Sequence, residues 1–323
     1  FVAYISYLEQ EAEGFLIEKL GTFGDWCAPG MVVPKKTGLT FTSSWYFQHD
    51  AGLLAEIARV LGDEEAATRY RTLQSNIIDA MNKRFRKEKW YESLPLSPWD
   101  FPDQTSQALA LSSPLVTGEE RRIIAATLNS LVTAESGNHV GTGIHGTRYL
   151  LTALTDSGYA EKAFTIAAQE TFPGWGYMIR EGATTLWERW EKIESVGMNS
   201  HNHIMFGSID LWFFNAVAGL RISDTGFREL LFTPGLLEKI TYAYARIATP
   251  CGTAMTAWER KGRYILLDIR IPPGCTGTVR VPEGFSIESF VSTPADGRRE
   301  RIPLLESSTV KVSSGWYHAE LVG

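Results

Sequence analysis

A carboxylate stands between two indoles in the segment Gly182-Ala-Thr-Thr-Leu-Trp-Glu-Arg-Trp190. Tryptophan rings can pack on the apolar C–H faces of sugar rings, and a carboxylate can bind sugar hydroxyls or move a proton. Desolvation raises the pKa of a carboxyl group among aromatic rings, whereas a guanidinium such as Arg189 lowers it, so Glu188 is tunable for acid–base catalysis. The alternative is a helix start at which Trp187 and Trp190 fill a core and the Glu188–Arg189 pair is solvated.

A second polar cluster follows in the segment Asn199-Ser-His-Asn-His203. Its amide and imidazole groups are of the kind that bind hydroxyls. We predict that His203 contacts the substrate, with a helix cap at Ile204 as the alternative. The cluster of Asn202 and His203 with Glu188 has no convincing third metal ligand, so no metal site is predicted.

An earlier loop, Gly21-Thr-Phe-Gly-Asp-Trp-Cys-Ala-Pro-Gly30, is punctuated by glycine and carries an acid beside an aromatic residue. Trp26 is a candidate stacking platform for a sugar ring, or else a core residue beneath the loop. Asp25 is a candidate ligand for a sugar hydroxyl, or else caps its own turn through an Asx hydrogen bond. The chemistry that these residues share is carbohydrate binding. Trp90, Tyr91 and Trp99 are candidates for outer subsites, or else belong to a loop docked on the rim.

The composition of the chain excludes several classes of binding partner and cofactor. The 323 residues carry a net charge of −6, which argues against a nucleic-acid partner because phosphate binding needs a basic face. No apolar run approaches the ~20 residues of a membrane span. The three cysteines Cys27, Cys251 and Cys275 show no C-x-x-C spacing, and no glycine-rich phosphate loop is present, so neither a metal nor another cofactor is predicted. The pattern specifies neither an oligomeric state nor a compartment.

Residues 1–225 have the periodicity of paired helices, and long loops after alternate helices carry the acids and aromatic residues. This pattern predicts a helical toroid with one functional rim rather than a four-helix bundle. We expect Ser43 or Ser44, Asp63 and Asp103 to cap helices. The expected helices cover residues 4–20, 43–62, 63–85, 103–111, 117–131, 142–154, 158–170 and 204–220.

Residues 226–323 change to short runs of strand length separated by Pro-Cys-Gly, Lys-Gly and Pro-Pro-Gly turns. Roughly six to eight such strands predict a second domain, an antiparallel β-sandwich. The expected strands begin near residues 242, 253, 264, 276, 286, 308 and 315.

Several motifs, taken in order, resemble one enzyme family. They are Gly24-Asp-Trp26, Thr142-Gly-Ile-His-Gly-Thr147, Pro173-Gly-Trp-Gly-Tyr-Met178, the Gly182–Trp190 segment, Met198-Asn-Ser-His-Asn-His203, and, in the β region, Pro250–Trp258 and Ile271–Val279. Together they resemble the C-terminal half of the catalytic domain of α-L-rhamnosidases of glycoside hydrolase family 78, followed by that family's β-sandwich.

The resemblance implies an (α/α)6 barrel, N-terminally incomplete here, and inverting hydrolysis of terminal α-L-rhamnose. By this resemblance Glu188 is the general base, Trp26 binds the sugar ring and His203 contacts the sugar. Trp187 belongs to the same motif, and we predict that Trp187 and Asp25 also bind the substrate. The family's general acid belongs to an upstream block that these 323 residues lack, so the chain alone is expected to be inactive or incomplete, with apolar helix faces left uncovered. The alternatives are another inverting glycosidase or phosphorylase on the same toroid, and a non-catalytic carbohydrate-binding fragment.

Overall fold

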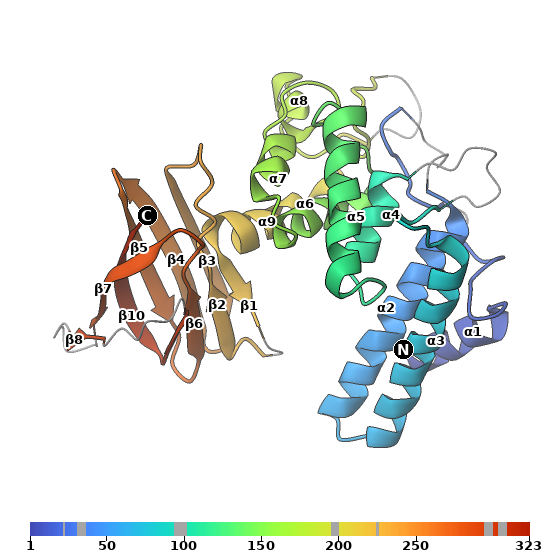
Figure 1. The fold of residues 1–323 in the computed structure, drawn as a ribbon, viewed down its shortest axis with the longest axis horizontal. Coiled ribbons are helices and arrows are strands. Elements are labelled where there is room, and N and C mark those ends of the chain that lie inside the picture. The colour runs from blue at the N-terminus through green and yellow to red at the C-terminus, as the bar shows by residue number, and fades with distance from the viewer. Residues whose placement is uncertain are drawn as a thin grey trace. The chain divides into compact units, whose positions relative to one another are not determined.

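The structure is a computed structural model that describes residues 1–21, 23–30, 37–93, 102–194, 200–223, 226–293, 300–302 and 309–323. The chain divides into two compact units, Phe1–Ser208 and Ile209–Gly323. The first unit is helical and the second is mainly β-sheet (Figure 1). The boundary expected between residues 225 and 226 stays a prediction.

Antiparallel helices build the first unit. Helices α2 and α3 form a hairpin closed by the turn at Gly62, and α6 packs against both α4 and α7 (Figure 1). The helices are α1(Val2–Glu11), α2(Leu39–Val60), α3(Glu64–Phe85), α4(Gln104–Leu111), α5(Gly118–Ser130), α6(Ile144–Asp156), α7(Ala160–Ala167) and α8(Trp175–Arg180). The short segments η1(Leu131–Glu135) and η2(Ile204–Phe206) complete this unit.

Two of the predicted helix caps are confirmed. The Asp63 carboxylate accepts a hydrogen bond from the Ala66 amide at 3.0 Å, and Asp103 accepts one from the Ser106 amide at 2.8 Å. The cap predicted at Ser43 or Ser44 is wrong, because α2 begins one turn earlier at Leu39.

The two serines instead hold the preceding loop against the helix. The Ser44 hydroxyl accepts from the Ile17 amide at 3.0 Å, and the Ser43 hydroxyl donates to the Leu20 carbonyl at 3.4 Å. A serine used for such tertiary contacts looks like a cap in the sequence because both uses need the same short hydroxyl side chain.

Two expected helices differ in extent. The first ends at Glu11, because Ala12 leaves the helical conformation with φ −74° and ψ 134°, and Gly14 follows with φ +57°. The helix expected over 204–220 is broken into η2, α9(Ile209–Trp212) and the π-helical segment η3(Phe213–Ala218). Gly219 then takes a left-handed conformation with φ +81°, and the chain continues into a strand. Glycine suits this position because a residue with a side chain would be strained at that φ.

Helix α8 was not expected from the sequence. Its six residues lie within a motif rich in glycine and aromatic residues, which has a weak helical signal. It buries Trp175 and Met178 in the unit's core.

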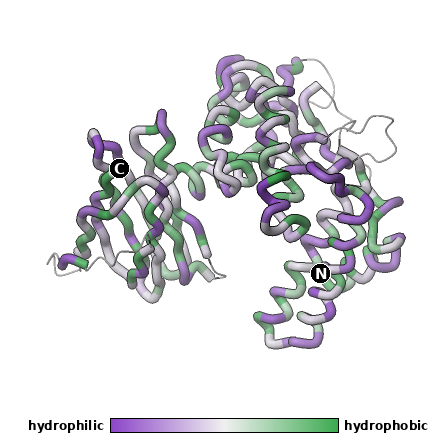
Figure 2. The backbone as a smooth tube through the Cα atoms, viewed as in Figure 1, coloured by the Kyte–Doolittle hydropathy of each residue, from purple (hydrophilic) through white to green (hydrophobic). Residues whose placement is uncertain are grey.

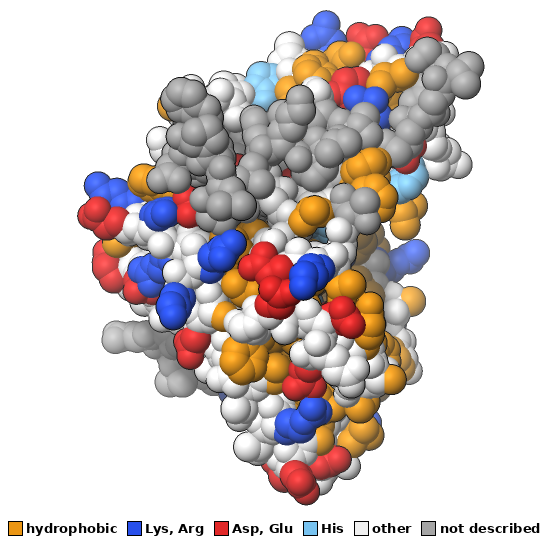
Figure 3. Space-filling view, turned by 90° about the vertical axis from the view of Figure 1, so that its right-hand side faces the viewer, with side chains coloured by type: hydrophobic (Ala, Val, Ile, Leu, Met, Phe, Trp, Pro, Cys, Tyr) orange, Lys and Arg blue, Asp and Glu red, His pale blue; other side chains and the backbone are white. Residues whose placement is uncertain are grey.

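Part of the helical unit leaves apolar side chains uncovered. On α2 the side chains of Leu53, Ile57 and Val60 are 50%, 44% and 61% exposed, although Trp45 and Phe47 on the same helix are buried. Figure 2 shows hydrophobic and hydrophilic residues alternating along the helices, and Figure 3 shows hydrophobic side chains interspersed with acidic and basic ones on the surface.

The second unit packs two sheets around one core. A four-stranded sheet has the order β1-β2-β6-β9 and a six-stranded sheet has the order β3-β4-β5-β10-β7-β8. The strands are β1(Leu220–Ile222), β2(Glu229–Phe232), β3(Tyr242–Thr249), β4(Gly252–Lys261), β5(Tyr264–Ile271), β6(Thr276–Arg280), β7(Ser286–Thr293), β8(Glu300–Arg301), β9(Thr309–Val312) and β10(Gly315–Val322).

The β-sandwich prediction holds, with additions. All seven expected strands are present. Strands β1, β2 and β8 were missed because they are only two to four residues long. Strand β2 pairs with β6 in parallel, whereas the other strand pairs among the described residues are antiparallel. The shared core includes Phe232, Trp258 and Phe290.

Candidate active site

Asp25 connects the Gly-Asp-Trp loop to two helices. Its side chain is buried, and its oxygens accept hydrogen bonds from the amides of Gly143 at 2.7 Å, His145 at 2.8 Å and Gly146 at 3.1 Å. The Thr105 hydroxyl of α4 also donates to it. Asp25 is therefore a remote cap for the N-terminus of α6, whose backbone N–H groups and partial positive charge stabilise a carboxylate.

This geometry differs from the alternative considered for Asp25, a cap of its own turn. The described partners of its side chain lie 80 to 121 residues further along the chain. A contact between Asp25 and a sugar hydroxyl stays a prediction.

Trp26 is held in place by its backbone. Its carbonyl accepts from the Ile144 amide at 2.9 Å. At Gly143 an added Cβ would lie 2.1 Å from that same carbonyl oxygen, so only glycine allows the loop and α6 to approach so closely. The half-buried Trp26 ring meets Phe23 edge-on, with ring centroids 4.6 Å apart.

Glu188 lies in a non-helical segment beside residues 200–203. Its backbone amide donates to the Ser200 carbonyl at 2.8 Å, and its Oε2 accepts from the Ser200 amide at 2.9 Å. The side chain is partly buried, so the carboxylate is neither freely solvated nor enclosed in the core. Met198 and Asn199, which belong to the same predicted cluster, lie outside the described residues.

Two contacts join the Glu188 segment to the Gly-Asp-Trp loop and α6. The Gly30 amide donates to Glu191 Oε1 at 2.5 Å, and the Trp190 indole N–H donates to the Thr142 carbonyl at 2.9 Å. Arg189 pairs with Glu191 at 3.2 Å. The three motifs, far apart in the sequence, therefore meet in one region of the helical unit.

Burial and the charged groups of these segments both affect the pKa of the Cys27 thiol. Burial raises its pKa to about 11, the Arg189 guanidinium opposes that rise, and the carboxylates of Glu188, Glu191 and Asp25 add to it.

The two tryptophans that flank Glu188 are both buried. Trp190 is fully buried, stacked on Phe206 at 4.0 Å and edge-on to Trp175 at 5.0 Å. Trp187 is only 3% exposed, and the His201 imidazole stacks on its ring at 4.9 Å. Core packing, the alternative considered for these indoles, therefore describes both. A contact between Trp187 and substrate stays a prediction.

His203 lies next to the Glu188 segment. Its amide donates to the Leu186 carbonyl at 2.8 Å, and its Nδ1 accepts from the Met205 amide at 3.1 Å at the start of η2. The imidazole thus acts as the helix cap considered above. Because Nδ1 accepts this bond, the neutral ring carries its proton on Nε2, and a contact between Nε2 and a sugar stays a prediction.

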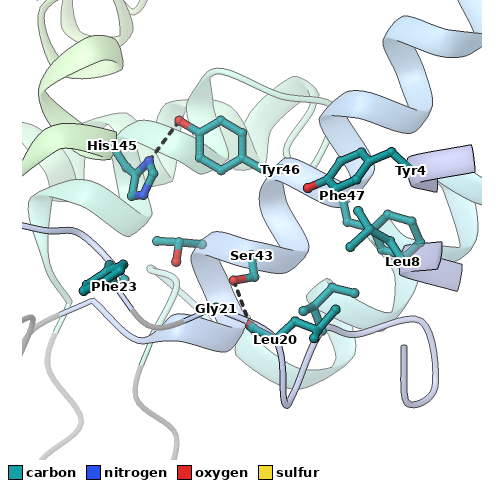
Figure 4. A pocket seen from close by; sticks show the side chains of 12 residues that line it. Tyr4, Leu8, Leu20, Gly21, Phe23, Ser43, Tyr46, Phe47 and His145 are labelled. Atoms are coloured by element: carbon teal, nitrogen blue, oxygen red, sulfur yellow. Dashed lines mark hydrogen bonds between the residues drawn. The ribbon is translucent and has the colours of Figure 1, made fainter. Parts of the chain in front are cut away.

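A cavity of about 320 Å³ adjoins the Gly-Asp-Trp loop. Figure 4 shows it between α1, α2 and the first turn of α6, with Phe23 on its wall. Gly24 also lines the cavity. The Tyr46 hydroxyl lies 3.1 Å from His145 Nδ1. Burial raises the pKa of Tyr46 and lowers that of His145, so both groups are neutral at pH 7.

The sequence did not single out Tyr46 or the side chain of His145. Tyr46 lies within an ordinary helical pattern, and His145 was noted only as a member of its motif. Of the outer-subsite candidates, Trp90 is partly buried, Tyr91 is buried in the core, and Trp99 lies outside the described residues.

The described residues contain no group of three or more His, Cys, Asp or Glu side chains placed to hold a metal ion. No helix in the same part of the chain is long and apolar enough to cross a membrane.

Two family models match the chain. Residues 1–217 match the bacterial alpha-L-rhamnosidase six-hairpin glycosidase domain, and residues 219–289 match the bacterial alpha-L-rhamnosidase C-terminal domain. The fold class expected from the sequence, a six-hairpin glycosidase domain followed by a β domain, is confirmed.

Proteins similar to this chain in sequence are named alpha-L-rhamnosidases. An alpha-L-rhamnosidase of Streptomyces avermitilis is 32% identical over 87% of this chain, which spans 26% of that protein. One from Formosa agariphila is 30% identical over 82% of this chain, which spans 29% of it. The chain thus covers less than a third of the length of either relative.

Solved structures similar to this chain are also those of alpha-L-rhamnosidases. The alpha-L-rhamnosidase from Dictyoglumus thermophilum superimposes with a TM-score of 0.88 at 38% identity, over 99% of this chain and 36% of that one. The Streptomyces avermitilis alpha-L-rhamnosidase, solved as a complex with L-rhamnose, gives a TM-score of 0.83 at 29% identity, over 100% of this chain and 30% of that one.

Proposed function

The chain belongs to the bacterial alpha-L-rhamnosidase six-hairpin glycosidase family, and on this premise we propose that it forms part of an enzyme that hydrolyses terminal α-L-rhamnose from rhamnosides. The substrate class is a glycoside or oligosaccharide that ends in rhamnose. The rhamnose complex of the Streptomyces avermitilis protein supports this substrate.

Glu188 is proposed as the general base of an inverting mechanism. In such a mechanism an acid protonates the glycosidic oxygen while the base, on the opposite face of the sugar, removes a proton from water. The oxygen of that water bonds to the anomeric carbon as the leaving alcohol departs. The two carboxyl groups lie roughly 6.5–9.5 Å apart to leave room for the water. The partner acid is proposed to lie outside these 323 residues.

The observation that carries this proposal is the placement of Glu188. A backbone amide orients its carboxylate at 2.9 Å, its side chain is partly buried, and its segment is bonded to the loop that presents Trp26. A general base needs this combination of fixed orientation and access.

The surrounding residues are proposed to have separate roles. Trp26 offers its ring to the apolar face of the sugar, and His203 offers its Nε2–H to a hydroxyl. Asp25 positions Trp26, because the amides at the N-terminus of α6 and the Thr105 hydroxyl donate to its oxygens. Trp187 supports Glu188 from within the core.

The test is Glu188→Gln in the full-length protein that carries this chain. We expect kcat for an aryl α-L-rhamnoside to fall by at least about a hundredfold, because the amide cannot accept the proton of the attacking water. Binding of L-rhamnose should persist. NMR of the first product formed by the unmodified protein should show the β-anomer.

The matched control is Glu181→Gln. Glu181 is an exposed carboxylate seven positions earlier that pairs with Lys192 at 3.3 Å. Its replacement should leave kcat unchanged. If Glu188→Gln retains the parent rate, the base is assigned to the wrong residue. If the α-anomer forms first, the mechanism is not inverting.

A further inference from the structure

The outer face of the six-stranded sheet carries exposed aromatic side chains. Alternation along the strands sends Ala245, Trp258 and Ile269 into the core. Their neighbours therefore project from the opposite face of the sheet. On that face Tyr242 is 71% exposed, Tyr244 58% and Trp316 42%.

Strand register places these residues in rows across the sheet. Tyr244 on β3 lies opposite Ala257 on β4, Ala257 opposite Asp268 on β5, and Asp268 opposite His318 on β10. This row therefore carries a tyrosine ring on β3 and a polar pair on β5 and β10, with the small Ala257 side chain between them. His318 Nδ1 and the Asp268 carboxylate are hydrogen-bonded, and both side chains are about half exposed.

The adjacent row contributes a second aromatic residue. Arg270 on β5 lies opposite Trp316 on β10, and its guanidinium is 5.0 Å from the centroid of the Trp316 ring. Strands β3 and β10 are three steps apart in the sheet, so Tyr244 and Trp316 are separated across the strands by roughly 14 Å. This span suits a short oligosaccharide rather than a single sugar ring.

Charge on this face is mixed. Arg246 and Arg270 are offset by Glu259 and Glu320, which project on the same side two rows further along the strands. A nucleic acid would require an excess of cations. The residues instead offer aromatic surface for C–H groups and an Asp–His–Arg set for hydroxyls, and the chain belongs to a family of enzymes that act on carbohydrate.

We propose that the outer face of the β3-β4-β5-β10 sheet binds a neutral oligosaccharide chain, with Tyr244 and Trp316 as aromatic contacts and Asp268, His318 and Arg270 as hydroxyl ligands. The residues of this site belong to the second unit, whereas Glu188 belongs to the first. It would hold a polymeric substrate near the enzyme without taking part in hydrolysis.

The test is affinity electrophoresis of the 323-residue chain carrying Glu188→Gln, in gels that contain rhamnogalacturonan, arabinogalactan or hydroxyethylcellulose. We expect retardation in at least one neutral gel, and the dissociation constant to rise about tenfold in Trp316→Ala and in Tyr244→Ala, the loss expected for one aromatic contact. Both side chains are exposed, so circular dichroism should be unchanged.

Tyr7→Ala is the matched control, because Tyr7 is an aromatic residue of similar exposure on α1. It should bind like the parent. The proposal is overturned if no gel retards the parent chain, if Trp316→Ala and Tyr244→Ala keep full retardation, or if retardation occurs only with the uronic-acid polymer. It is also overturned if sedimentation shows that Trp316 mediates association of two copies instead. Because binding is measured without hydrolysis, its failure is distinct from failure of the proposed rhamnosidase activity.

Discussion

Replacing Asp25 with alanine should destabilise the helical unit far more than replacing an ordinary helix cap. Three backbone N–H groups at the N-terminus of α6, including that of the preceding Gly143, and the Thr105 hydroxyl would lose a buried acceptor. Each buried donor left unpaired costs about 1–3 kcal/mol, and partial relaxation or entry of water reduces the sum. We expect a loss of about 3–5 kcal/mol in the free energy of unfolding.

Asp63→Ala is the comparison. Asp63 caps α3 through one amide at the surface, so its replacement should cost only about 1 kcal/mol. Asp25→Asn should fall between the two, because the amide keeps one acceptor oxygen but turns its N–H₂ group toward other donors.

The assay has two parts. Urea unfolding followed by tryptophan fluorescence gives the free energy of each variant. Amide hydrogen exchange at Gly143, His145 and Gly146 then reports whether the N-terminus of α6 has opened. This role of Asp25 is refuted if Asp25→Ala lowers the free energy of unfolding no more than Asp63→Ala does. It is also refuted if these three amides stay as protected from exchange as in the parent, because Asp25 would then not hold the loop against the N-terminus of α6.

Three further predictions concern the same region. Gly143→Ala should lower the urea midpoint and reduce affinity for L-rhamnose, because its Cβ would lie 2.1 Å from the Trp26 carbonyl oxygen; unchanged values would refute the close approach. The Cys27 thiol should resist Ellman's reagent at pH 8 until the protein unfolds, because its pKa is raised to about 11 and it is 1% exposed, whereas fast labelling of Cys27 would contradict that burial. Burial lowers the pKa of His145 in the folded state below its ordinary value of 6.5. As the pH falls below about 6.5, the unfolded state therefore takes up the proton before the folded state does, and the free energy of unfolding should decrease until the pH reaches the lowered pKa. Urea midpoints at pH 7.5 and 5.5 should differ less in His145→Gln than in the parent, and an equal difference would exclude His145 as the source.

Helices and strands were predictable where local signals agree with the fold. Asp63 begins α3 because its carboxylate caps the helix immediately beside it, and periodic apolar residues from Tyr70 to Phe85 reach the core. The strands of the β unit likewise follow alternation and glycine turns. Ser43 and Ser44 misled because their hydroxyls serve residues 23 to 27 positions away, which no local pattern records.

For the candidate site, the sequence offered candidate residues but not the arrangement of their segments. Motifs named Glu188, Trp26 and His203, and the structure joins their segments by hydrogen bonds. The function of Asp25 depends on Gly143, His145 and Gly146, more than a hundred residues away. The stacking of His201 on Trp187 likewise depends on two segments that pair only after folding.

The helical turns between Ile209 and Ala218 belong to the β unit. The Trp258 indole donates to the Val217 carbonyl at 2.9 Å, and Ala218 and Leu220 are buried in the sandwich core. The structural unit is therefore longer than its strands. A gene fusion that joined this sandwich to another protein at its first long strand would leave the buried Trp258 N–H without an acceptor, so successful recombination should carry these turns along.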